Sequence, residues 1–303
     1  MNKFLSRFGG KALADSFRKT VSGDPSGAPD WSRQMDIGND MGLFGPTSAV
    51  WVVHGCVSTL VGGVRALLMQ AAHPAALTGV AEHSQYDTDP LGRLERTTRW
   101  LTITTFGSTE AIAMEAQRVN AMHEKVRGQF RDGSGENRSY SARDPRYLLW
   151  VHCAFTESFL RAHIELGYEI PQGQDQYIRE WAKSAEPLGL TNAPQSVADL
   201  RNVMESFAKN EVASIAMTPP IVGFILKPPF SKAGLVFYRI LCNAAISTID
   251  EPFLSVLGLK PKSRHWLRVS RFLLDILGYL LGNESPSQKI ARERIKRLGL
   301  LHG

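Results

Sequence analysis

Two short segments of the chain carry residues whose types and spacing could do chemistry. The first, residues 93–97, reads Arg-Leu-Glu-Arg-Thr, and the second, residues 119–123, reads Val-Asn-Ala-Met-His. On a helix, Arg93 and Thr97 share one face because they stand four positions apart. His123 lies on an otherwise apolar stripe. An imidazole among apolar side chains, near an arginine and a threonine of a neighbouring helix, offers a haem iron one axial nitrogen ligand and polar groups beside the other axial position.

Both His123 and Arg93 also have simpler interpretations. The apolar face of a helix expected over residues 108–130 is made by Ile112, Val119, His123, Val126 and Phe130. A histidine in such a core position is more often hydrogen-bonded than metal-bound. Burying Arg93 without a counter-charge would be costly. A haem propionate, a bound oxygen species, Glu95 or Glu124 could each supply that charge, so the spacing alone leaves these alternatives open.

Two further histidines and two aspartates raise the alternative of a metal site without haem. His73 and His83 flank a short expected helix, and Asp87 and Asp89 follow it. Their spacing matches no standard ligand pattern, so capping and turn roles are the simpler interpretation. His152 is expected to pack in the core or to line a pocket. The chain also lacks a GxSxG elbow, a P-loop and a GxGxxG segment after a strand.

The elements that must position these residues are predicted to be helices. Helical periodicity with capping residues recurs along the chain, whereas strand signals are nearly absent. The expected helices span residues 3–20, 48–72, 75–83, 90–106, 108–130, 144–166, 172–186, 196–210, 232–257, 262–281 and 286–298. The proline-rich residues 218–231 are expected to be irregular. The sequence therefore predicts an all-α, single globular helical domain, with a pocket between core helices.

Three regions are expected within this all-α chain. Residues 1–40 should form a basic helix and a loop, residues 41–260 the helical core, and residues 261–303 basic helices packed on that core. The chain has 303 residues, 43% of them hydrophobic and 21% charged, which is typical of a globular protein rather than a disordered one.

The net charge of +6 is concentrated near the C-terminus, from Lys260 to His302. Nucleic acid is excluded as the expected partner because the aromatic and glycine signatures of RNA-binding modules are missing. Two interpretations of the basic segment stay open. It can face anionic lipid, or it can be an ordinary solvated helix face.

Cysteine usage and hydropathy bear on the compartment. Cys56, Cys153 and Cys242 each lie in an apolar helical run, which favours buried reduced thiols and a cytoplasmic protein. The N-terminal residues do not resemble a secretory signal. No run of about 20 residues is purely apolar. Residues 219–259 come nearest to one, and shallow peripheral contact with a membrane is a hypothesis for them.

An ordered set of motifs resembles the oxygenase family of the fungal MpaB protein and the bacterial latex clearing proteins. The resemblance covers about residues 40–260. The motifs are Leu-Met-Gln-Ala-Ala-His-Pro at 68–74, His-Ser at 83–84, Asp-Pro at 89–90, Arg-Leu at 93–94, Arg-Thr at 96–97, Phe-Gly at 106–107, His123, and Trp-Val-His at 150–152.

The resemblance implies an all-α fold that holds one b-type haem. His123 matches the proximal iron ligand of the latex clearing proteins, and Arg93 and Thr97 match the arginine and threonine near their distal side. Arg96 replaces a lysine that can ligate iron in that family. A guanidinium stays protonated and is a poor ligand, so Arg96 is expected to bind the cofactor's periphery instead. Arg127 is a further candidate for that role, as is the buried-helix residue Arg65.

The resemblance also implies an activity. The family uses O2 to cleave carbon–carbon double bonds in isoprenoid chains, so the expected function is a haem-b-dependent oxygenase acting on a small hydrophobic substrate. Arg93 and Thr97 would be catalytic, and His123 would hold the iron. Two alternatives remain. One is a haem-binding carrier, sensor or peroxidase-like protein without oxygenase turnover. The other is a basic helical protein at a membrane surface, with His123 packed in the core.

Overall fold

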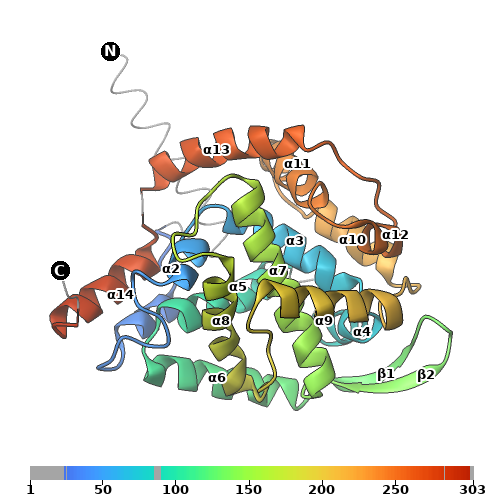
Figure 1. Ribbon diagram of the computed structural model, residues 1–303, viewed down its shortest axis with the longest axis horizontal. Coiled ribbons are helices and arrows are strands. Elements are labelled where there is room, and N and C mark those ends of the chain that lie inside the picture. Colours follow the sequence, from blue (N-terminus) through green and yellow to red (C-terminus); the bar gives the residue numbers. More distant parts are fainter. Residues whose placement is uncertain (1–23, 25, 85–89, 283, 301–303) are drawn as a thin grey trace.

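Two helices cross at the centre of the fold. In the computed structural model, which describes residues 24, 26–84, 90–282 and 284–300, α3 (Thr59–Ala71) packs against α7 (Pro145–Glu165) (Figure 1). The two backbones approach closely at Gly62. A Cβ atom there would lie 2.7 Å from Cδ1 of Phe159 and 3.2 Å from its Cα. The remaining helices surround this pair, and the predicted all-α, single-domain class is confirmed.

A buried ion pair also joins α3 to α7. Arg65 is fully buried, and its guanidinium donates to both carboxylate oxygens of Glu157, with Nη2 2.8 Å from Oε1. The same guanidinium donates to Ser158 Oγ at 2.9 Å and to Thr248 Oγ1 at 3.1 Å. These hydrogen bonds offset the free-energy cost of burying the guanidinium charge. Because the donors of Arg65 are engaged with residues of α7 and with Thr248, the role of Arg65 is to join the helices.

The expected helix over 48–72 is wrong, because the chain breaks into α2 (Ala49–His54) and α3. Ser48 caps α2, since its hydroxyl accepts from Trp51 N at 3.2 Å. The break begins at Gly55, where a Cβ atom would lie 2.1 Å from Nε2 of Gln288. The side chain of Gln288, from a distant helix, therefore occupies the space that a side chain at position 55 would need.

The expected helix over 108–130 is also wrong, because it ends at His123 and a hairpin follows. Helix α6 (Thr109–His123) leads into strands β1 (Arg127–Arg131) and β2 (Asn137–Ser141), which pair antiparallel. Phe130 and Tyr140 are the buried residues of these strands. The turn carries an Asp132-Gly133 pair, and the Asp132 carboxylate accepts from Ser134 N at 2.9 Å. Val126 and Phe130 therefore leave the helix face on which they were expected.

Other elements match the expected ranges closely. They are α4 (Pro74–His83), α5 (Pro90–Phe106), α7, α9 (Val197–Asn210), α13 (His265–Leu281) and α14 (Pro286–Arg297). Most begin at a residue whose side chain caps the helix. Asp144, for example, accepts from Arg146 N at 2.8 Å before Pro145 opens α7. The expected helix over residues 3–20 lies outside the described residues.

Three expectations in the second half of the chain need correction. Part of the segment expected to be irregular forms α10 (Thr218–Leu226), because Pro219 and Pro220 lie in its first turn, where no backbone N–H is needed. The expected helix 232–257 divides into α11 (Lys232–Ile246) and α12 (Glu251–Val256), again with a proline in the first turn. The expected helix 172–186 is α8 (Gln174–Ala182) followed by a short 3-10 helix, η2 (Lys183–Leu188).

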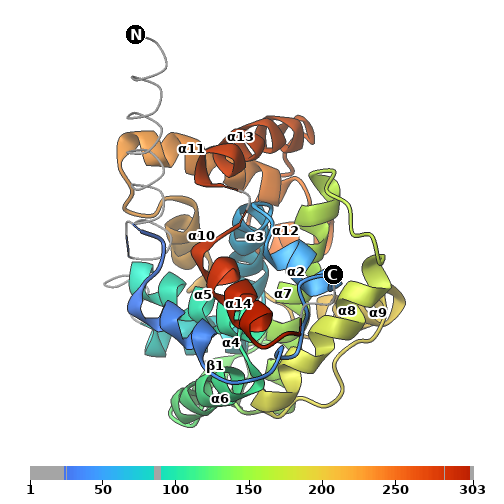
Figure 2. The same ribbon diagram turned by 90° about the vertical axis from the view of Figure 1, so that its left-hand side faces the viewer.

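The C-terminal helix is tied to the start of the described chain. Arg294 of α14 is fully buried and donates to the carbonyl oxygen of Met35 and, at 3.2 Å, to that of Phe106. Met35 belongs to η1 (Asp30–Asp36), a 3-10 helix that packs on α14. Figure 2 shows α14 lying across the side of the molecule near α5.

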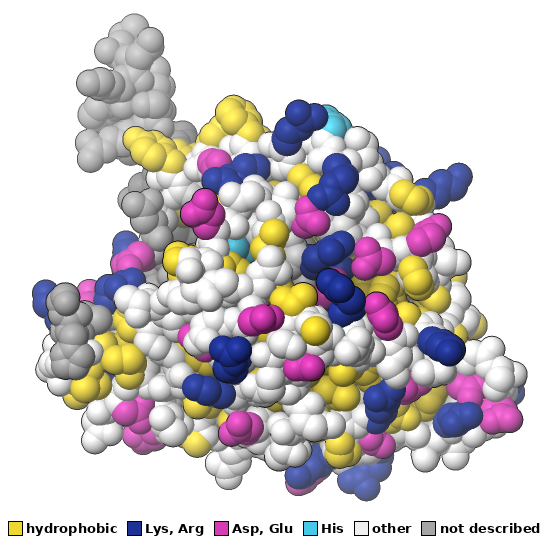
Figure 3. Space-filling model, viewed as in Figure 1, with side chains coloured by type: hydrophobic (Ala, Val, Ile, Leu, Met, Phe, Trp, Pro, Cys, Tyr) yellow, Lys and Arg dark blue, Asp and Glu magenta, His cyan; other side chains and the backbone are white. Residues whose placement is uncertain are grey.

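Large apolar side chains are exposed on α11 and α13. They are Val236, Phe272, Ile276, Tyr279 and Leu280, with Tyr279 86% accessible. Figure 3 shows hydrophobic side chains protruding at the end of α13, whereas charges of both signs are interspersed over the rest of this face. Within the described residues, no helix is long and apolar enough to cross a membrane.

Candidate functional site

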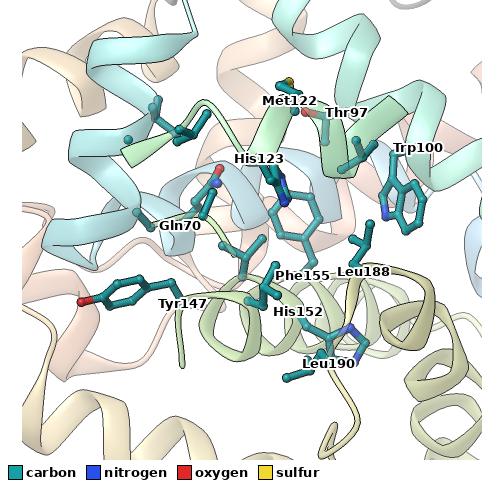
Figure 4. A pocket seen from close by; sticks show the side chains of 18 of the residues that line it. Gln70, Thr97, Trp100, Met122, His123, Tyr147, His152, Phe155, Leu188 and Leu190 are labelled. Carbon is teal, nitrogen blue, oxygen red and sulfur yellow. The ribbon is translucent and has the colours of Figure 1, made fainter. Parts of the chain in front are cut away.

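A cavity of about 290 Å³ lies between α4, α5, α6, α7, η2 and the hairpin. Apolar and aromatic side chains form most of its wall, among them Trp100 of α5, Phe155 of α7, and Leu188 and Leu190 at the end of η2 (Figure 4). Such a wall suits an apolar ligand, because specificity in small-molecule sites comes from a few polar groups set into an apolar surface.

His123 is one of those polar groups. It is the last residue of α6 and lines the cavity (Figure 4). Its Nδ1 atom is buried, and within the described part of the chain no hydrogen-bond partner reaches it. Burial lowers the pKa of this imidazole below its usual value, and the positive charge of Arg143 lowers it further. The ring is therefore neutral at neutral pH, and one of its nitrogens keeps a lone pair.

Local sequence explains why His123 reaches the cavity. Ser108 caps α6, accepting from Ala111 N at 3.1 Å. The helix then buries Ile112 and Val119 on the face that continues to His123. After His123 the chain turns into the hairpin, and Ala142 N donates to Val126 O at 2.9 Å. The hairpin thus closes the cavity beside the end of α6.

The two described α5 residues of the predicted site also lie at the cavity. Thr97 and Arg96 both line it, and Arg96 Nη2 lies 3.5 Å from the carbonyl oxygen of Ser84. Arg93 belongs to α5, but its side chain lies outside the described residues. The structure therefore brings Thr97, Arg96 and His123 to one cavity.

Arg127 and Arg65 are placed elsewhere. Arg127 is exposed on β1, and its Nε donates to the carbonyl oxygen of Glu124 at 3.1 Å. It does not line the cavity, because the chain has already left α6 and turned outward. Arg65 is engaged with Glu157 in the α3–α7 contact. Neither arginine can serve the cavity without leaving its present partner.

Two more histidines line the cavity, and a third does not. Burial lowers the pKa of His152 to about 4, so it is neutral as well. His83 lines the cavity from the end of α4. His73 instead caps α4, since its Nδ1 accepts from Ala75 N at 3.2 Å, as its interpretation as a capping residue predicted.

The alternative of a metal site without haem gains no support from the described residues. Asp87 and Asp89 lie outside them. Within the described ranges, no group of three or more His, Cys, Asp or Glu side chains stands close enough to hold a metal ion.

Sequence reasoning missed several polar residues of the cavity. Arg118 of α6 lines it and donates to the buried carboxylate of Glu115. Tyr140 of β2 lines it and donates to Glu82 Oε2 at 2.6 Å. The Glu115-x-x-Arg118 spacing was a signal for the first pair. For Tyr140 the local signal was the Asp132-Gly133 pair of the turn, but the hairpin was not predicted because no alternating apolar residues flank that pair.

The family of the chain follows from comparison with known proteins. Residues 51–277 match the family described as ER-bound oxygenase mpaB/B'/Rubber oxygenase, catalytic domain. All cavity residues described above fall within that range. The fold and the match thus define a helical oxygenase domain. The chain belongs to the MpaB and rubber oxygenase family, as its motifs predicted. Comparisons with curated proteins and with solved structures found no match.

Proposed function

We propose that this protein is a haem-b-dependent oxygenase that uses O2 to oxidise or cleave a hydrophobic, isoprenoid-like substrate. His123 would be the proximal iron ligand, and Arg93 and Thr97 would lie near the distal side. The observation that carries the proposal is the buried Nδ1 of His123, which has no protein partner within the described residues and lies at an apolar cavity. Membership of an oxygenase family supports the reaction class.

The chemistry of the residues present fits a haem. Iron in haem takes a neutral imidazole as its protein ligand, and burial keeps His123 in that form. A haem face needs an apolar wall, which the cavity provides through Trp100 and Phe155. Arg96 provides a cation for a propionate. When bound, the haem would supply the iron at which O2 is activated.

The protein's own residues have four tasks in this proposal. His123 holds the cofactor and fixes its position. The apolar wall excludes water and orients an alkene by shape. The hydroxyl of Thr97 donates a hydrogen bond toward the reacting oxygen or toward the cofactor's edge. The neutral His152, whose pKa of about 4 keeps it unprotonated, adds no positive charge that would disfavour an apolar substrate.

The deciding experiment compares the visible absorption spectra of the wild type, His123→Ala and His152→Ala after expression with added haem. Both variants remove an imidazole from the same cavity wall. We expect a Soret band in the wild type and in His152→Ala, and its loss or displacement in His123→Ala alone. A wild type without a Soret band after haem titration would refute the proposal.

Turnover separates the oxygenase from the haem-binding carrier or sensor. The wild type should consume O2 when an isoprenoid alkene is added, and carbonyl products should appear in mass spectra. A protein that shows the Soret band but leaves a panel of isoprenoid alkenes unchanged would instead be a carrier or sensor.

A further inference from the structure

A buried carboxylate beside the cavity is shared by two arginines. Glu115 of α6 is 1% exposed. Its Oε2 accepts from Arg99 Nε at 2.9 Å, and its Oε1 accepts from Arg118 Nη2 at 2.6 Å. Arg118 Nε also lies 3.0 Å from Oε2, so this guanidinium grips the carboxylate along one edge. The single negative charge of Glu115 is thus shared by the positive charges of Arg99 and Arg118.

The cluster therefore keeps a surplus positive charge at the cavity. Arg118 is the member that lines the wall, and its side chain is 32% exposed. Among the described residues that line the cavity, none is an aspartate or glutamate. The positive surplus of the cluster of Glu115, Arg99 and Arg118 therefore favours an anionic group on whatever occupies the space.

The guanidinium of Arg118 also has N–H groups that Glu115 does not engage. Glu115 takes the edge formed by Nε and Nη2, and within the described residues Arg118 donates to no other group. The opposite edge, formed by Nη1 and Nη2, presents two parallel N–H groups. That geometry matches a carboxylate in a bidentate arrangement. Glu115 holds the guanidinium of Arg118 in place, and Arg99 in turn holds Glu115. This order reduces the entropy lost when a ligand binds.

The neighbours of Arg118 in the cavity wall are apolar. Val119 and Met122 flank it on α6, and Trp100 faces the space from α5. A ligand held here would place its charged end on Arg118 and its apolar body against these side chains. That combination selects an amphipathic molecule with one carboxylate rather than a plain hydrocarbon.

We propose that Arg118 is a carboxylate-binding residue of this cavity, with Glu115 and Arg99 as positioning residues. The carboxylate has two sources, a propionate of haem or the acid end of an elongated apolar substrate. The substrate source rests on the proposed function, whereas binding of a carboxylate to the apoprotein does not require it.

The test measures affinity for matched pairs of ligands that differ only in the carboxylate. The first pair is haem and haem dimethyl ester, titrated by absorbance. The second is a long-chain isoprenoid acid and its methyl ester, titrated by calorimetry with the apoprotein. Each pair is measured with the wild type, Arg118→Gln and Arg127→Gln, the last being an exposed guanidinium outside the cavity.

We expect the wild type and Arg127→Gln to prefer the free acid in at least one pair. Arg118→Gln should lower affinity for that acid about 10- to 100-fold and leave its ester unchanged, as loss of a charge-assisted hydrogen bond predicts. The pair that responds identifies the source. Arg118→Lys keeps the positive charge but loses the two parallel N–H donors, so it should retain only part of the preference for the free acid over its ester.

Two results would overturn the inference. One is equal affinity for acid and ester in both pairs. The other is an acid preference that survives unchanged in Arg118→Gln. A failure of the proposed function gives a different result. In that case the protein binds no haem but still prefers the isoprenoid acid over its ester, and this preference is lost in Arg118→Gln. Far-ultraviolet circular dichroism confirms that Arg118→Gln is folded, and Arg118→Lys provides the second variant if it is not.

Discussion

Acidification should destabilise the fold through two buried histidines. His54 is held between Thr105 Oγ1, 2.9 Å from its Nδ1, and Tyr177 OH, 3.0 Å from its Nε2. Burial, reinforced by the nearby His163, lowers the pKa of His54 to about 3. Burial alone lowers the pKa of His152 to about 4. Both imidazoles are therefore neutral in the folded protein at pH values where the unfolded chain is protonated.

The size of the effect follows from proton linkage. An unfolded imidazole has a pKa of about 6.5. At pH 8 both states are neutral and each site contributes no pH-dependent energy. At pH 5 the unfolded state binds a proton that the folded state does not, so each site costs about 2 kcal/mol of unfolding free energy. The loss from His54 and His152 together is therefore about 4 kcal/mol at pH 5. It sets in as the pH falls below about 6.5, and it keeps growing until the pH passes the folded pKa values of about 4 and about 3.

Urea unfolding at pH 8 and pH 5 measures this loss. His54→Gln and His152→Gln should each reduce the difference between the two pH values by about 2 kcal/mol, whatever their stability at pH 8. The exposed His265→Gln is the matched control and should keep the wild-type pH dependence. If either buried variant shows the full wild-type difference, that histidine is protonated in the folded state and the argument from burial is wrong.

Three further outcomes are expected. Gly62→Ala should lower the free energy of unfolding by about 1–3 kcal/mol in thermal unfolding, because its new methyl group meets Phe159 of α7. Gly63→Ala is the control and should be neutral or stabilising, because no atom lies within 4 Å of a Cβ atom there. Equal effects of the two substitutions would contradict the close approach of α3 and α7. Arg294→Met should cost about 1–3 kcal/mol in urea unfolding, since two buried carbonyls lose their donor; an unchanged midpoint would refute this. Finally, the wild type should float with vesicles that contain anionic lipid, and replacing the exposed Phe272 and Tyr279 by Ser should reduce that binding. Absence of wild-type binding would refute the hypothesis of peripheral membrane contact.

Helix starts were predictable because their signals are local. Ser285 and Pro286 open α14, and a reciprocal pair of hydrogen bonds joins the backbone and side chains of Ser285 and Gln288. The Asp144-Pro145 start of α7 works in the same way. Each signal lies within four residues of the helix it opens, so no knowledge of the rest of the fold is needed.

Helix interruptions were harder to predict than helix starts. At the break after α2, Gln288 of the last helix packs against Gly55, and the periodicity of residues 48–72 carries no trace of that contact. The hairpin was missed for a different reason. Its first strand buries a single apolar side chain, Phe130, so the alternation that normally indicates a strand is too short to outweigh a helical pattern.

Some residues of the candidate site were expected from the sequence, whereas others became apparent only in the tertiary structure. Thr97, Arg96 and His123 were expected at one site because their motifs resemble those of the oxygenase family, and all three line the cavity. Arg127 was expected as a further arginine at the cofactor, but α6 ends at His123 and Arg127 lies exposed on β1. Arg118 required the tertiary structure, since only the packing of α5 against α6 shows that two arginines share one buried carboxylate.

The end of α6 at His123 has a consequence for the charge on that residue. The carbonyl end of a helix favours a protonated histidine, typically by 0.3–1 kcal/mol, which corresponds to less than about one pKa unit. The pKa of His123 nevertheless lies below its usual value, because burial and the positive charge of Arg143 disfavour the protonated ring. An iron ligand must be deprotonated. The end of α6 therefore still presents a neutral ring to the cavity, which is the form that the proposed role of His123 as iron ligand requires.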